Sequence, residues 1–293
     1  MFSKFADLRL QPAQRSGLYG GMDRRHMLMT AGLGLLAAAT KLPEATATPT
    51  TPTPAAPAPQ NYIFHDEFDG PAGSAPDPTK WTIALARESM EDPTFWELPE
   101  NVGQYRDDRR NVFLDGNSNL VFRAFKDGPT YYSGKVFGKW NGGIGHTWEA
   151  RMKLDCLTAG CWPAWYLSNN SPVNGGEVDV LEWYGNGSWG PATAIHAKLN
   201  GGEHVSARIA VDPDWHTWRV VWDDAGMSFY KDYVDGAAPY YNVPAHTLPD
   251  WQFNDPGYQM FPVFDLAVAG SGGGDPRGGT YPANMLIDYI RVW

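Results

Sequence analysis

Three acidic residues, Glu177, Asp179 and Glu182, lie within six positions of one another. The residues between them are those of a β-strand, and side chains on a strand point alternately to its two faces. Glu177 and Asp179 therefore share a face. Glu182 joins them only if an extra residue, a β-bulge, lies near Val180 and Leu181, and such bulges are common beside active sites.

Carboxylates brought together in this way suit the hydrolysis of glycosidic bonds. A retaining glycosidase uses two carboxyl groups about 5.5 Å apart, which Glu177 and Glu182 could reach by leaning toward each other, with Asp179 between them. Three neighbouring carboxylates cannot all be ionised without a cost, so one is expected to hold a proton near neutral pH, as a general acid must. A solvated acidic strand or a cation site is the alternative.

Aromatic residues near the acidic segment are candidates for sugar binding, because indole rings offer flat apolar faces to sugar rings and N–H groups to their hydroxyls. We expect Trp162 and Trp183 to lie in a cleft, and Trp165 is a further candidate, although most of the 13 tryptophans must fill the core. His196 lies on an expected neighbouring strand and could bind substrate or a catalytic carboxylate. A surface or core histidine is the alternative.

The two cysteines of the chain, Cys156 and Cys161, enclose four residues. In an exported protein they could form a local disulfide that braces the loop before Trp162. Two buried free thiols are the alternative. The seven histidines show no metal-ligand spacing, and no phosphate-binding glycine loop occurs.

The composition of the chain excludes some classes of binding partner. The chain has 293 residues and a formal charge of -10, and residues 61–293 hold 17 basic against 30 acidic residues. Such a chain does not neutralise phosphates, so neither nucleic acid nor an anionic membrane is an expected partner. With 43% apolar residues it can bury a large core.

The chain divides into three parts. Residues 1–47 resemble a twin-arginine export signal, because Arg24 and Arg25 precede a moderately apolar run and an Ala-x-Ala cleavage pattern. That run is too short to span a bilayer, which disfavours the alternative of an uncleaved membrane anchor. Residues 48–60, nearly all Thr, Pro and Ala, are expected to form an extended linker. Residues 61–293 are expected to form one domain.

That domain is predicted to be all-β, an antiparallel sandwich or jelly roll. Short runs of β-branched, aromatic and alternating residues are separated by Gly, Pro, Asn and Asp, and no long segment has helical periodicity. Strands are expected at 119–125, 147–154, 177–184, 193–199, 217–222, 227–233, 260–267 and 285–293.

Residues 61–293 resemble glycoside hydrolase family 16, most closely its laminarinase-type members from actinobacteria. The acidic strand matches the family signature Glu-x-Asp-x-x-Glu, in the spacing of laminarinases and agarases. Supporting motifs occur in the expected order: 65–70 (HDEFDG), 145–154 with 148–151 (WEAR), 162–165 (WPAW), 266–268 (LAV) and 287–292 (IDYIRV). The sequence departs from the family at Asp265, where relatives commonly have asparagine, and at Lys135, where arginine is frequent.

The resemblance implies a concanavalin A-like jelly roll whose concave face forms a glycan cleft, and a retaining mechanism. By position, Glu177 corresponds to the nucleophile, Glu182 to the general acid/base and Asp179 to the assisting carboxylate. No cofactor is required for the chemistry. Members often hold a structural calcium on the convex side, for which the matching positions are Glu67, Gly116 and Asp288.

Together these features predict an exported endo-acting hydrolase of β-1,3-linked glucan, acting as a monomer that is secreted or attached to the cell wall and does not insert into the membrane after processing. A neutral polysaccharide is favoured because an acidic domain repels sulfated galactans. The alternatives are a glucan transglycosylase or an agarase that uses the same residues, and a non-catalytic glycan-binding surface protein on the same fold.

Overall fold

The computed structural model describes residues 61–85, 103–197 and 203–293. The expected export signal, 1–47, and the expected linker, 48–60, lie outside the described residues. Within the described ranges, no helix is both long enough and apolar enough to cross a membrane.

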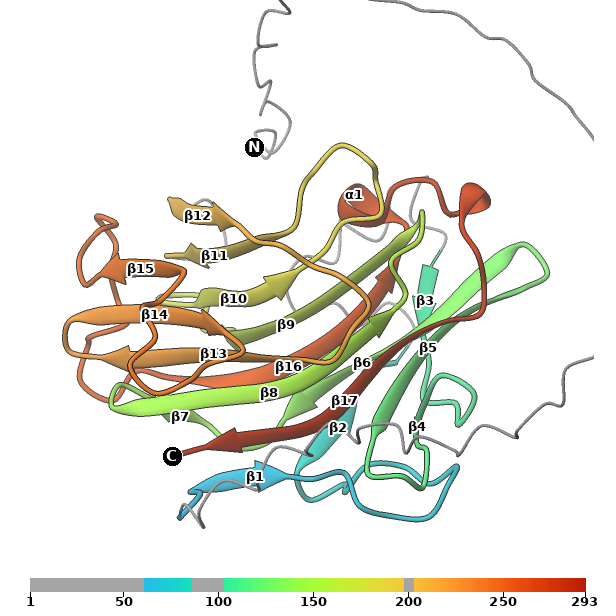
Figure 1. Ribbon diagram of the computed structural model, residues 1–293, viewed down its shortest axis with the longest axis horizontal. Helices are drawn as coiled ribbons and strands as arrows, with labels where there is room; N and C mark the ends of the chain where they lie inside the picture. The colour runs from blue at the N-terminus through green and yellow to red at the C-terminus, as the bar shows by residue number, and fades with distance from the viewer. Residues whose placement is uncertain (1–60, 86–102, 198–202) are drawn as a thin grey trace, which may run out of the picture. The chain divides into compact units, whose positions relative to one another are not determined.

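Two sheets pack against each other (Figure 1), and their strands pair antiparallel except for β3, which runs parallel to β6. The first sheet contains β1 (Phe64–Asp66), β4 (Val112–Leu114), β5 (Leu120–Asp127), β8 (His146–Asp155), β13 (His216–Asp223), β14 (Gly226–Lys231), β15 (Tyr241–Pro244) and β17 (Ala283–Val292). The second contains β2 (Trp81–Ile83), β3 (Gly103–Tyr105), β6 (Thr130–Gly138), β7 (Gly142–Gly143), β9 (Cys161–Asn169), β10 (Gly176–Glu182), β11 (Ala192–His196), β12 (His204–Arg208) and β16 (Gln259–Val268). One short helix, α1 (Gly270–Gly273), and a 3-10 turn, Pro276–Gly278, follow β16.

The pairing of the strands sets the order of each sheet. The first sheet has the order β5-β17-β8-β13-β14-β15, with β4 beside β5 and β1 beside β17. The second has the order β6-β16-β9-β10-β11-β12, and β2 and β3 lie beside β6. The β5–β6 hairpin joins the two sheets. All eight segments expected from the sequence contain a strand, so the all-β prediction is confirmed.

The core lies between the sheets because each strand turns alternate residues inward. In β13, for example, Trp218, Val220 and Trp222 are buried while the residues between them are partly exposed. Large aromatic side chains fill this layer, as expected from the composition. Among the described tryptophans, six are buried: Trp81, Trp148, Trp165, Trp218, Trp222 and Trp251.

The second sheet also carries side chains on the face turned away from the core, which we call the outer face. A smaller apolar cluster lies there, including Tyr105, Tyr166 and Val263, with Trp162 packed against it. Both faces of β9 and β16 are consequently covered, and nearly all of their residues are buried. Strands packed on both sides form a rigid base for the neighbouring strand β10.

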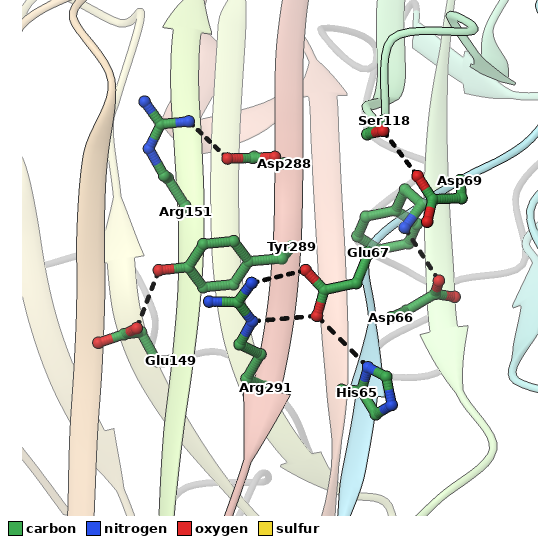
Figure 2. Close-up of polar contacts among 11 residues, drawn as sticks. His65, Asp66, Glu67, Asp69, Ser118, Glu149, Arg151, Asp288, Tyr289 and Arg291 are labelled. Carbon is green, nitrogen blue, oxygen red and sulfur yellow. Dashed lines mark hydrogen bonds and ion pairs between the residues drawn. The ribbon is translucent and has the colours of Figure 1, made fainter. Parts of the chain in front are cut away.

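The opening and closing segments of the domain are joined by an ion pair. β1 pairs with the end of β17, and Glu67, just after β1, accepts two hydrogen bonds from Arg291, with N–O distances of 3.0 and 2.7 Å. Figure 2 shows this fork and the ring of Tyr289 beside it. The guanidinium lies 3.7 Å from the centroid of that ring. A bidentate, stacked arginine is a more specific link than a simple surface pair.

Glu67→Gln should therefore lower the free energy of unfolding by about 1 kcal/mol, a modest value because the pair is only partly buried. Urea unfolding followed by tryptophan fluorescence would measure this. Glu203→Gln, at an exposed glutamate, is the matched control and should have no effect. Equal midpoints for the two variants would contradict a stabilising role of the fork.

Candidate active site

The three acidic residues lie on β10, and a bulge brings them to one face. Asp179 pairs with Tyr166 of β9 and Leu181 pairs with the preceding residue, Trp165, so β10 has one residue more than β9 at this point. The register shifts at the same place on the β11 side. Val180 and Leu181 are consecutive and both fully buried. The predicted bulge is confirmed, and it turns Glu182 to the outer face with the other two acids.

Small residues flank the acids. Glu182 lies between Ala164 of β9 and Ala192 of β11 in the cross-strand register, and Asp179 lies beside Ala194. A methyl group fills little of the space above the sheet, so the Glu182 carboxylate is not covered by its cross-strand neighbours, whereas Asp179 has Tyr166 on its other side. Glu182 is partly exposed, whereas only 2% of Asp179 is exposed.

Glu177, Asp179 and His196 meet at one end of the acidic strand. One ligand atom from each of the three lies within 4.8 Å of the other two, and His196 Nε2 is 3.1 Å from Asp179 Oδ2. His196 is opposite Glu177 in the register and stacks on His204 with ring centroids 5.2 Å apart. Burial, and then the neighbouring His196, lower the pKa of His204. His196 therefore contacts a candidate catalytic carboxylate, one of the two contacts expected for it.

Glu182 is held by two donors. Trp162 Nε1 donates to Oε1 at 3.0 Å, and the Tyr184 hydroxyl donates to Oε2 at 2.5 Å. The rings of the two donors lie 5.9 Å apart and 46° from parallel. Burial, and then the nearby Glu182 carboxylate, raise the pKa of Tyr184 well above its ordinary value. The hydroxyl therefore stays protonated at every pH of interest.

A glycine places Trp162. A Cβ added to Gly272 of α1 would lie 2.3 Å from Trp162 Cδ2, so the indole rests directly on the glycine backbone. The turn after β10 is fixed to the same segment, because Asn186 donates from its side chain to the Ser271 carbonyl and from its backbone to the Gly272 carbonyl. Asn186 also accepts from the backbone N–H of Trp189. α1 thus orders both aromatic walls beside Glu182.

Residues 104–258, slightly more than half of the chain, match the model of Glycosyl hydrolases family 16. The chain belongs to this family. It is 68% identical to a beta-1,3-glucanase from Mycobacterium marinum, over 80% of this chain and 99% of that one, with a TM-score of 0.75. The mycobacterial neighbours confirm the predicted resemblance to laminarinase-type members from actinobacteria.

Two further relatives of the family 16 chain have different descriptions. A Mycobacterium tuberculosis protein is 54% identical, over 80% of this chain and 99% of that one, with a TM-score of 0.76, and is described as an immunostimulatory antigen and pseudo beta-1,3-glucanase. Glucan endo-1,3-beta-glucosidase A1 from Niallia circulans is 29% identical over 84% of this chain. The family 16 chain spans only 39% of the length of that second protein.

Two of the expected sugar-binding tryptophans do not lie on the outer face. Trp165 has no exposed surface and stacks on Phe264 in the core, with ring centroids 6.0 Å apart, so it cannot contact a glycan. Trp183 is partly buried and packs against the main core. The reason is strand alternation, because Trp165 is three positions from Trp162 and Trp183 is adjacent to Glu182.

The residues that take these places are Tyr184 and Trp189. Tyr184 shares the face of Glu182 because it is two positions away. Trp189 is 46% exposed and lies edge-on to Tyr184, with ring centroids 5.3 Å apart. Alternation along the strand could have identified Tyr184 from the sequence. Nothing in the local sequence distinguishes Trp189, since its position depends on the turn that Asn186 braces.

The expected disulfide is not present, because Cys156 and Cys161 are both free and buried. Burial raises the pKa of the Cys161 thiol to about 12 and that of Cys156 well above its usual value. The thiolate, which is the reactive form in disulfide formation, is therefore scarce at neutral pH. In this structure the loop before Trp162 is held instead by backbone hydrogen bonds, from Gly160 to Gly273 and from Ala269 to Gly160.

The residues expected to hold calcium are only partly suited to it. The Glu67 carboxylate is occupied by Arg291, and Asp288 Oδ2 is 2.5 Å from Arg151 Nη1 (Figure 2). Ca²⁺ prefers six to eight oxygen ligands. The site stays a prediction, and no step of the chemistry depends on it.

The two departures from the family pattern are partners. Asp265 of β16 pairs with Lys135 of β6 in the register, and Lys135 Nζ lies 3.5 Å from Asp265 Oδ2. Tyr105 donates to the same carboxylate at 2.9 Å. Both charged residues are buried. Asp265 is opposite Ala164 of β9, and Ala164 is opposite Glu182, so these residues lie in one row across the sheet.

The two tryptophans of β9 should respond differently to substitution. Trp165→Ala should lower the free energy of unfolding by about 3–5 kcal/mol, because it leaves a cavity in the core. Trp162→Phe keeps an aromatic ring over Gly272 but removes the donor to Glu182, so the fold should persist while turnover falls roughly tenfold. Urea unfolding and glucan hydrolysis measured on both variants would test this, and equal stabilities would contradict the assignment of Trp165 to the core.

Proposed function

We propose that this family 16 protein is an exported, endo-acting, retaining hydrolase of β-1,3-linked glucan. In this proposal Glu177 is the nucleophile, Glu182 the general acid/base and Asp179 the assisting carboxylate. The observation that carries it is the placement of all three acids on one face of β10, with Glu182 held between Trp162 and Tyr184.

The proposed reaction has two steps. In the first, a carboxylate oxygen of Glu177 attacks the anomeric carbon while Glu182 gives its proton to the glycosidic oxygen, which leaves with the bonding electrons. In the second, Glu182 removes a proton from water, the water oxygen attacks the same carbon, and the ester to Glu177 breaks. Asp179 and His196 lie 3.1 Å apart beside Glu177 and hold its surroundings in place.

Neutral glucan is the proposed substrate for three reasons. The domain is acidic, and the acidic residues of β10 add local negative charge that repels a sulfated polymer, even while Glu182 carries its proton. The aromatic faces of Trp162 and Trp189 suit the apolar faces of glucose rings. The M. marinum relative is named a beta-1,3-glucanase.

A non-catalytic glycan-binding protein is the second candidate, because the M. tuberculosis relative is described as a pseudo beta-1,3-glucanase. The complete acidic set and the two donors on Glu182 favour an enzyme for this chain. Turnover and binding can be separated experimentally, since a binding protein retains affinity for laminarin without releasing products.

Glu177→Gln and Glu182→Gln should each lower hydrolysis of laminarin by several orders of magnitude, because one removes the nucleophile and the other the acid. Reducing-end assays would measure the rates, and circular dichroism would confirm that the variants fold. Glu203→Gln is the matched control. Near-normal rates in either active-site variant would refute the assignment.

A substrate panel should show turnover of laminarin and none of carrageenan. Lichenan and agarose complete the panel, since agarose turnover without laminarin turnover would instead identify an agarase. Mass spectrometry of the products would show an endo pattern of mixed oligosaccharides. Products longer than the starting chains would indicate a transglycosylase. Activity on carrageenan alone would overturn the charge argument.

The proposed export depends on the first 47 residues. Replacing both Arg24 and Arg25 by lysine should retain the protein inside the producing cell, because paired arginines distinguish twin-arginine signals. Immunoblots of the cell and culture fractions would measure this. Unchanged export of the double variant would contradict the twin-arginine route and would leave the enzymatic proposal unaffected.

A further inference from the structure

The two oxygens of the Glu182 carboxyl have chemically different partners. Oε1 faces the indole N–H of Trp162, and Oε2 faces the hydroxyl of Tyr184. An indole nitrogen can only donate, whereas a phenol hydroxyl can donate or accept. A protonated carboxyl has a strong acceptor, its carbonyl oxygen, and a weaker one, its hydroxyl oxygen. Because the Trp162 indole N–H can only donate, it favours the state of Glu182 in which Oε1 is the carbonyl oxygen.

We propose that the proton that Glu182 gives to the leaving group is carried on Oε2, and that Tyr184 is a positioning residue that directs it there and stabilises the carboxylate left behind. This inference rests on the proposed function. With Oε1 fixed as the carbonyl oxygen by Trp162, Oε2 carries the hydroxyl. Tyr184 accepts from that hydroxyl in the free enzyme and turns to donate when substrate takes the proton.

The geometry of the Tyr184 contact suits both protonation states of Glu182. A distance of 2.5 Å is at the short end of the range for O–H···O hydrogen bonds, so the hydroxyl is close enough to bond Oε2 whether that oxygen carries a proton or a charge. Tyr184 is also held in place, because its ring packs between Trp162 and Trp189. A donor ordered in advance strengthens its bond to Oε2 as the proton leaves, at little cost in reorganisation.

Other charged groups lie in the same sheet as Glu182. Glu177 and Asp179 on the same strand oppose ionisation of Glu182, and Tyr184 favours it. The strands that pair with β10 carry Tyr166 of β9 and His196 of β11, and the strands beyond them carry His204 and Arg208 of β12, Asp265 of β16 and Lys135 of β6. Tyr184→Phe leaves all of these in place, so it isolates the contribution of one hydroxyl.

In the proposed first step, the Oε2–H bond breaks as the glycosidic oxygen gains the proton, the bond from the anomeric carbon to that oxygen breaks, and a Glu177 oxygen bonds to the carbon. Tyr184 then donates to the anionic Oε2. In the second step Oε2 regains a proton from the attacking water. Tyr184 exchanges no proton with the substrate in either step.

The test is Tyr184→Phe with Tyr240→Phe as the matched control. Tyr240 also loses a hydroxyl that is hydrogen-bonded in the wild type, to Thr193 of β11 and, at 3.4 Å, to the Val180 carbonyl. Thr193 still donates to that carbonyl in the variant, so the bulge keeps its closer hydrogen bond. Hydrolysis of laminarin, which needs the acid, is compared with that of a dinitrophenyl β-laminaribioside, whose leaving group needs no proton, across the full pH range.

For Tyr184→Phe we expect kcat on laminarin to fall roughly 10- to 100-fold, the loss expected for a hydrogen bond to a charged group. The activated substrate should change less than about threefold, because its leaving group departs unprotonated. The alkaline limb of the laminarin profile should move to higher pH by about one unit, since the ionised form of Glu182 loses a donor. Tyr240→Phe should leave kcat on both substrates and the alkaline limb unchanged.

An unshifted alkaline limb, or an equal loss on both substrates, would overturn the role of Tyr184. Failure of the proposed function gives a different result, in which the wild-type protein turns over neither substrate. The carbon-13 NMR titration of the Glu182 carboxyl, assigned with Glu182→Gln, then decides the inference without any turnover. Its midpoint should rise by about one pH unit in Tyr184→Phe and stay fixed in Tyr240→Phe.

Discussion

The structure depends most on the extra residue in β10. In a regular strand Glu182 would point inward, where an acidic side chain among aromatic residues is strongly disfavoured. The bulge at Val180 and Leu181 solves this by placing two consecutive apolar residues in the core. Glu182 is thereby turned outward, and the position two residues later, Tyr184, turns outward with it. The acid and its donor are therefore ordered by the same irregularity in the backbone.

The neighbouring strands of the second sheet hold the bulge in place. β9 lies between β10 and β16, and its inward face carries the fully buried Trp165. The outward face of β9 carries Trp162, which rests on Gly272 and donates to Glu182. One strand thus anchors the core through one indole and orients the general acid through another. A sheet packed on both faces resists the shift in register that would undo the bulge.

The all-β fold and the shared face of the three acidic residues could be predicted from the sequence, because both follow from the alternation of side chains along a strand. Eight strands, the bulge and the three carboxylates were predicted from that rule together with the family signature. Continued past Glu182, the same rule places Tyr184 on the outer face and turns the expected Trp183 away from it. Proximity in sequence is a poor guide on a strand, where adjacent side chains point in opposite directions.

Other features could not be read from the sequence, because they depend on contacts between distant segments. The pairing of Lys135 with Asp265 joins β6 to β16, and each residue alone looks like an isolated departure from the family. Glu67 was expected to hold a cation, yet its partner Arg291 lies more than 200 residues away. The position of Trp189 likewise depends on Asn186 and α1. In each case the deciding partner is known only when the sheets are assembled.

The Lys135–Asp265 pair also bears on how the outer face selects a polymer. Burying an ammonium without a counter-charge is costly, so the change of asparagine to aspartate and the retained cation form one unit. The pair is close to neutral, so it adds little net positive charge beside the acidic residues of β10. The local field is then negative although a lysine is present. An acidic domain and an acidic site act in the same direction, and both favour a polymer without sulfate groups.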